Sequence, residues 1–159
     1  SASPISHGMP AYLIDVSGEA LARGAANAAL NGRSNIEWRE GDAFETLRAF
    51  ARAHERFDTI VLDPPAFAKN RAAVPAAIRG YREVNLRAMR CLAPGGFLLT
   101  ASCSFHVRLP EFLTMLAEAA GDSGRRIHLR RILGQGEDHP EVLTIPETSY
   151  LKGAVLQAE

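Results

Sequence analysis

The middle of the chain reads FDTIVLDPPAF over residues 57–67. Residues 57–62 are rich in β-forming side chains and predict a strand. Asp63-Pro64-Pro65 must end this strand, because two prolines have no N–H with which to continue a hydrogen-bonded ladder. This segment therefore predicts a strand of a central sheet, with a stiff turn at its carboxyl end.

Apolar runs alternate with segments of helical period on both sides of this strand, which is the pattern of βαβ units. We predict further strands at 11–14, 36–38 and 97–101. Ser17 is expected to cap a helix that runs to about Leu30, with Gly32 ending it. Three later helices are predicted by residues that recur at helical spacing and so share one face. These faces are Phe44, Leu47, Ala51 and His54; Ile78, Tyr81, Asn85, Ala88 and Leu92; and Phe112, Leu113, Leu116 and Ala120.

The predicted fold is α/β and Rossmann-like, with a mostly parallel sheet. Two β-like segments near 127–133 and 150–156 are expected to pair as an antiparallel C-terminal edge. A length of 159 residues predicts one domain, residues 1–159. No apolar run reaches the roughly 20 residues that cross a bilayer, and Ser1 to Ser6 do not resemble a signal peptide, so we expect a cytoplasmic protein without a membrane partner.

The two cysteines, Cys91 and Cys103, are too few for a disulfide framework or a zinc site, and no metal is expected. The formal net charge is zero, which argues against nucleic-acid binding by bulk electrostatics. The best local candidate for polyanion binding is the basic segment 125–131, although its alternation equally describes a strand with one solvated face.

Polar residues follow four of the predicted strands directly: Asp15, Asp42, Asp63 and Cys103. In open α/β sheets, ligands bind beyond the carboxyl ends of the strands, so these residues are the candidate site. A carboxylate such as Asp15 can accept hydrogen bonds from both hydroxyls of a ribose. Helix capping is the alternative role for Asp15 and for Asp42.

The turn from Asp63 to Phe67 combines a fixed carboxylate with an aromatic ring, an arrangement suited to holding a flat heterocycle; a plain strand-ending turn is the alternative. Free cysteines are more often buried fillers than nucleophiles, and Cys91 fits that class. Cys103 differs because it falls at the predicted ligand-binding edge of the sheet.

From about Tyr12 to Val155 the chain resembles the large-subunit (23S) ribosomal RNA cytosine-C5 methyltransferases, class I enzymes that use S-adenosylmethionine. The segments that carry the resemblance are Asp15-Val16-Ser17, Asn27-Ala28, Asp42, 57–67, 79–85, 99–104, Asp138-His139-Pro140 and 150–153.

The resemblance implies that Asp15 binds the ribose of the cofactor, that Asp42 with Ala43 holds its adenine, and that Asp63, Pro64 and Pro65 lie between the methyl group and the target base. It implies that Cys103 is the nucleophile. Phe67, Lys69 and Tyr81 are the implied RNA-binding residues. The family commonly has a basic residue at the position of Ala66, so its contact is either missing in this chain or supplied by Lys69.

The glycine-rich loop of the family, with the strand before it, should precede Gly8-Met9-Pro10-Ala11, and Ser1 to His7 contain neither. We therefore expect a catalytic domain without its first central strand. A second copy of the chain is a candidate to complete the sheet, since an exposed strand edge invites pairing.

Two rival functions stay open: a methyltransferase directed at nitrogen, which needs no cysteine, and an inactive or self-associating fragment. A dinucleotide-dependent oxidoreductase has little support, because no Gly-x-Gly-x-x-Gly occurs.

Overall fold

The computed structural model describes residues 11–159, which form two compact units, one ending at Thr46 and the other covering Leu47–Glu159. The predictions about a signal peptide and about a glycine-rich loop before Gly8-Met9-Pro10 lie outside the described residues. The prediction of a single domain stays a prediction. Within residues 11–159, no helix combines the length and apolarity needed to cross a membrane.

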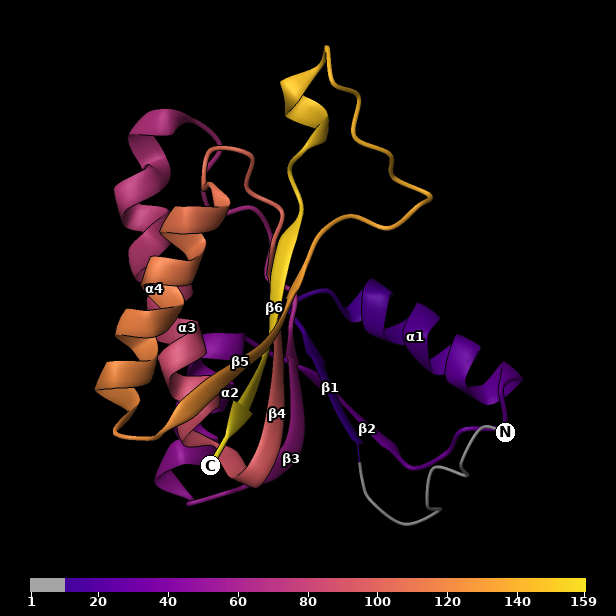
Figure 1. Cartoon of the computed structure of the whole chain (residues 1–159). Helices are drawn as coiled ribbons and strands as arrows, with labels where there is room; N and C mark the ends of the chain where they lie inside the picture. Colours follow the sequence, from indigo (N-terminus) through magenta and orange to yellow (C-terminus); the bar gives the residue numbers. More distant parts are fainter. Residues whose placement is uncertain (1–10) are drawn as a thin grey trace. The chain divides into compact units, whose positions relative to one another are not determined.

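The first unit pairs two parallel strands, β1 (Ala11–Asp15) and β2 (Ile36–Glu40), joined through helix α1 (Gly18–Leu30) (Figure 1). Ser17 caps α1 as predicted, because its Oγ accepts a hydrogen bond from the Ala20 N–H at 3.2 Å. Gly32 follows the helix with a φ of 64°, a conformation that glycine adopts without strain. These features confirm the predicted βαβ unit.

The second unit contains a four-stranded sheet in the order β3-β4-β6-β5. Its elements are α2 (Ala43–Arg52, which begins before the unit boundary), β3 (Phe57–Leu62), the 3₁₀ helix η1 (Arg71–Ala73), α3 (Val74–Arg90), β4 (Leu92–Ser102), α4 (Leu109–Ser123), β5 (Ile127–Leu133), the 3₁₀ helix η2 (Pro146–Thr148) and β6 (Lys152–Ala158). β3 and β4 are parallel, whereas β6 is antiparallel to both β4 and β5. The predicted antiparallel C-terminal pairing is confirmed; β6 lies inside the sheet, and β5 forms its edge.

Two predicted helix ends are wrong. Leu92 was assigned to a helix but begins β4, while α3 ends at Arg90. Pro94-Gly95-Gly96 lies within β4. The register of β4 with β3 shifts here, between Phe57 and Thr59, and such an irregularity accommodates residues that usually end a strand. His54 was placed on the face of α2 but follows the helix with a φ of 57°.

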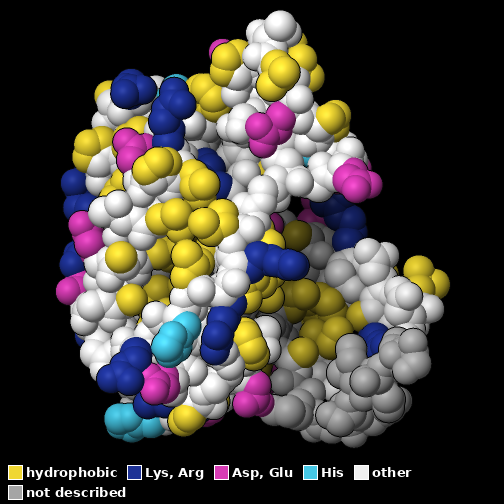
Figure 2. Space-filling view, viewed as in Figure 1, with side chains coloured by type: hydrophobic (Ala, Val, Ile, Leu, Met, Phe, Trp, Pro, Cys, Tyr) yellow, Lys and Arg dark blue, Asp and Glu magenta, His cyan; other side chains and the backbone are white. Residues whose placement is uncertain are grey.

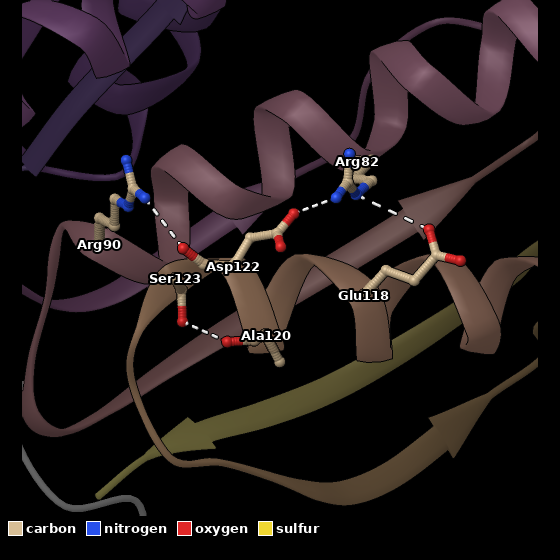
Figure 3. Close-up of polar contacts among 6 residues, drawn as sticks. All are labelled: Arg82, Arg90, Glu118, Ala120, Asp122 and Ser123. Carbon is tan, nitrogen blue, oxygen red and sulfur yellow. Dashed lines mark hydrogen bonds and ion pairs between the residues drawn. The ribbon is translucent and has the colours of Figure 1, made fainter.

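Helices α3 and α4 lie on one face of this sheet (Figure 1). Along β4, Leu98, Thr100 and Ser102 are buried, whereas the alternating Phe97 and Leu99 are exposed. Polar contacts join the two helices at their surface: the Arg82 guanidinium donates to the Asp122 carboxylate and lies 3.7 Å from that of Glu118 (Figure 3). The layered packing holds the carboxyl ends of β3 and β4 in place.

Among residues 11–159, β1 pairs only with β2, and no strand bridges β1 and β3. Completion of the sheet by a second copy stays a prediction.

Candidate functional site

The Asp63–Phe67 turn and Cys103 lie together at the carboxyl ends of two paired strands. Leu62 of β3 is in register with Thr100 of β4, so the residues that follow both strands emerge side by side. The Cys103 Sγ–H donates to the Pro64 carbonyl at 4.0 Å. Cys103 is half-buried and Asp63 is exposed. The predicted juxtaposition of the turn with the thiol is confirmed.

A buried hydrogen-bond network ties this turn to the loop that carries Cys103. The Tyr81 hydroxyl lies 2.9 Å from Ser104 Oγ and 3.4 Å from the Pro65 carbonyl. The Phe67 N–H donates to the Tyr81 hydroxyl at 3.4 Å, and the Ala68 N–H donates to Ser104 Oγ at 3.2 Å. Tyr81 and Ser104 are almost fully buried, so the network is shielded from water and fixes the two loops against each other.

The ring of Phe67 packs on that of Tyr81, with the ring centroids 4.6 Å apart. Gly80 allows this approach, because a Cβ added there would lie 3.3 Å from the Phe67 ring. The half-buried Phe67 is thereby held on one side by α3, which orients the whole turn.

Lys152, the first residue of β6, supports the Cys103 loop from the other side. Its buried Nζ donates hydrogen bonds of 2.6 Å to the carbonyls of Ser104 and Val107, which follow Cys103. Burial lowers the pKa of Lys152 to about 8, and the attraction of Cys103 and Glu111 partly opposes this shift. The sequence predicts no role for Lys152 or Ser104. The one indication of a buried role for Lys152 is that it is the single lysine within the mostly apolar run 150–156.

The ionisation of Lys152 gives a pH prediction. We expect its side chain to titrate near pH 8, so that the ammonium predominates at pH 7. Lys69 and Lys152 are the two lysines of the chain, so lysine 13Cε shifts followed by NMR against pH give two signals, and Lys69→Arg assigns them.

Between about pH 8 and 10.5 the unfolded chain keeps the Lys152 proton that the folded chain has lost, so this residue's contribution to the free energy of unfolding rises with pH. Denaturation of wild type and Lys152→Met at pH 7 and pH 10 should show the difference. A Lys152 midpoint above pH 10 would contradict the burial argument.

A hollow of about 240 Å³ lies beside the turn and includes Asp63, Thr100, Ala101 and Lys152 in its lining. Its lining combines the acidic residue Asp63 with apolar strand residues, whereas the Lys152 Nζ is bound to the carbonyls of Ser104 and Val107. This combination suits a small planar polar group such as a nucleobase.

The predicted cofactor-binding residues Asp15, Asp42 and Ala43 belong to the first unit. Asp15 Oδ1 accepts from the Ser17 N–H at 2.7 Å, and Asp42 Oδ1 accepts from the Glu45 N–H at 3.0 Å, so both make the capping bonds of the alternative interpretation. The Gly41 N–H donates to the Asp15 carbonyl at 3.0 Å, which places both carboxylates at one edge of the two-stranded sheet. Ala43 is the first residue of α2. The cofactor roles of these residues stay predictions.

The predicted RNA-binding residues differ in exposure. Lys69 is exposed, Phe67 is half-buried and Tyr81 is fully buried. The contacts of Tyr81 support a role in positioning the turn. Direct binding of RNA by these three residues stays a prediction.

Comparison with known proteins gives concordant results. Residues 5–141 match the family model described as "Methyltransferase domain". The chain is 44% identical over 147 residues to "Ribosomal RNA large subunit methyltransferase I" of Aeromonas salmonicida, covering 91% of this chain and 37% of that protein. It therefore spans little more than a third of the length of this relative.

Two solved structures show the same fold. SMU.776 in complex with SAH has a TM-score of 0.79 at 18% identity, covering 94% of this chain and 39% of that one. The N-methyltransferase NodS of Bradyrhizobium japonicum, also with SAH, has a TM-score of 0.60 at 19% identity, covering 94% and 66%. These likenesses confirm the predicted Rossmann-like α/β fold.

Proposed function

Since the chain belongs to the family of S-adenosylmethionine-dependent methyltransferases, we propose that it is part of an enzyme that methylates C5 of a cytosine in large-subunit ribosomal RNA. The name of the Aeromonas relative supports the RNA substrate. The contact between Cys103 Sγ and the Pro64 carbonyl carries the assignment to C5, because it brings a thiol to the turn that is expected to hold the base.

Methyl transfer to C5 needs a thiol because this carbon is too weak a nucleophile to react directly. Cys103 adds to C6 as its thiolate, and the electron pair displaced by the new S–C6 bond makes C5 nucleophilic. S-adenosylmethionine, when bound, supplies the methyl group. A base then removes the C5 proton, and the S–C6 bond breaks to release Cys103 as a thiolate.

Two residues of the second unit, Asp63 and Lys152, support this chemistry. We expect the Asp63 carboxylate to accept hydrogen bonds from the N3/N4 edge of the adduct. The Lys152 ammonium attracts the thiolate, and its bonds to the Ser104 and Val107 carbonyls keep the loop in place. In the first unit, Asp15 and Asp42 at the strand ends fit the ribose hydroxyls and adenine amino group of the cofactor, because carboxylates accept such bonds.

RNA that contains 5-fluorocytidine tests the proposal. Fluorine at C5 cannot leave as the proton does, so the S–C6 bond formed by Cys103 should persist. We expect the enzyme that carries these residues to form, in the presence of S-adenosylmethionine, a protein–RNA band stable on denaturing gels. Peptide mass spectrometry should locate the adduct on Cys103. Methylated RNA without any adduct would instead favour a nitrogen-directed methyltransferase.

A further inference from the structure

A groove of about 460 Å³ lies in the second unit between α2, the C-terminal half of α3 and the end of α4, and it is lined mainly by arginines. Six guanidinium groups and one carboxylate, that of Glu83, contribute to its walls. The arginines are Arg48, Arg52, Arg56, Arg87, Arg90 and Arg125. They come from α2, from α3 and from the residues that flank these helices and α4, so only the folded chain assembles them.

This groove differs from the basic segment 125–131, which was the sequence candidate for polyanion binding. Arg126 pairs with Glu159 at 2.9 Å, and Arg130 donates to Gln157 at 2.8 Å, so these exposed side chains have partners along the sheet edge. On the face shown in Figure 2, basic and acidic side chains are interspersed. The solvated-strand interpretation therefore describes this segment, while Arg125 turns into the groove.

Three of the arginines in the groove, Arg56, Arg90 and Arg125, are held by backbone carbonyls, and Arg56 donates to that of Glu55 at 3.0 Å. Arg87 instead pairs with the Glu83 carboxylate. Arg125 donates to the carbonyls of Met89 at 3.3 Å and Ala93 at 3.4 Å, and also to that of Leu92. Arg90 donates to the Asp122 carbonyl at 2.9 Å (Figure 3). Carbonyl acceptors fix a guanidinium group but, unlike a carboxylate, they do not cancel its charge. The fold thus already holds these guanidinium groups in place, so they lose little side-chain entropy when they bind an anion.

We propose that this groove binds backbone phosphates of the RNA substrate. Arginine donates two parallel hydrogen bonds to phosphate oxygens, and several such groups around one hollow suit a polyanionic strand. Arg125 of the groove donates to the carbonyl of Leu92, the first residue of β4. Leu92 is in register with Phe57 and Thr100 with Leu62, so about eight extended steps of roughly 3.3 Å separate Leu92 from Cys103, which places the groove roughly 25 Å from the thiol. The phosphates bound there belong to nucleotides distant from the target base. The inference rests on the proposed function only in taking RNA as the ligand.

The test is fluorescence anisotropy with a labelled 20-nucleotide single-stranded RNA, without cofactor, over a series of KCl concentrations. The double variant Arg52→Ala/Arg56→Ala removes two exposed groove arginines. We expect it to weaken binding roughly 10-fold and to reduce the slope of log K against log salt by roughly 1.4, since each single-strand phosphate contact contributes about 0.7. Circular dichroism checks that the variant is folded.

The matched control is Arg126→Ala/Arg130→Ala, which makes the same change in net charge on exposed residues of the β5 region and should bind RNA as wild type does. An equal loss in both variants, no loss in the groove variant, or no RNA binding by wild type would overturn the proposal. So would equally tight binding of polyglutamate, which would indicate an acidic protein partner. Cys103→Ala should bind RNA normally, so failure of the cytosine-C5 chemistry remains distinguishable from failure of the groove.

Discussion

Cys103→Ala is expected to lower the rate of methyl transfer to cytosine C5 by roughly 10³-fold or more, the scale on which enzymes lose activity when their nucleophile is removed. Without the thiol no S–C6 bond forms, and C5 stays too weak a nucleophile to accept the methyl group. The measurement is single-turnover transfer of a labelled methyl group to RNA, with the enzyme that carries these residues and the modified nucleoside identified by mass spectrometry.

Cys91→Ala is the matched control for this experiment. Cys91 is fully buried, burial raises the pKa of its thiol, and its Sγ donates to the Leu47 carbonyl at 3.8 Å. It has the surroundings of a core residue, so its removal should affect stability and leave the methyl-transfer rate near that of wild type. Full C5 methylation by Cys103→Ala would refute the covalent mechanism.

Asp63→Asn is expected to lower the rate of methyl transfer by roughly 10²–10³-fold, the usual cost of losing one group aimed at developing charge in a transition state. Asp63 is the residue before Pro64, whose carbonyl Cys103 contacts, and it is among the residues that line the hollow beside the turn. Asparagine keeps the shape and the diproline turn but removes the negative charge that we propose stabilises the N3/N4 edge of the adduct. The rate constant at saturating RNA is the quantity to compare.

Asp58→Asn provides the control, because Asp58 is an exposed acidic residue of β3 near the opposite end of the same strand. Its replacement makes the same change in net charge and should leave the rate unchanged. A normal rate at saturating RNA with a raised KM in Asp63→Asn would assign Asp63 to substrate binding alone. Equal effects of the two substitutions would point to overall charge and contradict a specific role.

Local chemistry made much of the fold predictable. Two consecutive prolines cannot continue a central strand, so the sequence predicts that β3 ends at Leu62. The Ser17 hydroxyl, a good helix N-cap, similarly predicts the start of α1. The helix predicted to reach Leu92 failed because glycine and proline mark both helix ends and strand irregularities. At Pro94-Gly95-Gly96 the shifted register with β3 shows that these residues mark a strand irregularity. The register depends on the pairing with β3, so the residues of β4 alone do not predict it.

The candidate site divides in the same way. The sequence by itself determined that the Asp63–Phe67 turn and Cys103 meet, because parallel neighbouring strands deliver their carboxyl ends to one edge. Only the tertiary structure decided that Lys152 and Tyr81 brace the Cys103 loop, and that arginines from separate segments share one groove. These contacts join residues more than 20 positions apart in the sequence. They arise because β6 pairs beside β4 and helices pack on the sheet, and no local sequence pattern predicts contacts between such distant segments.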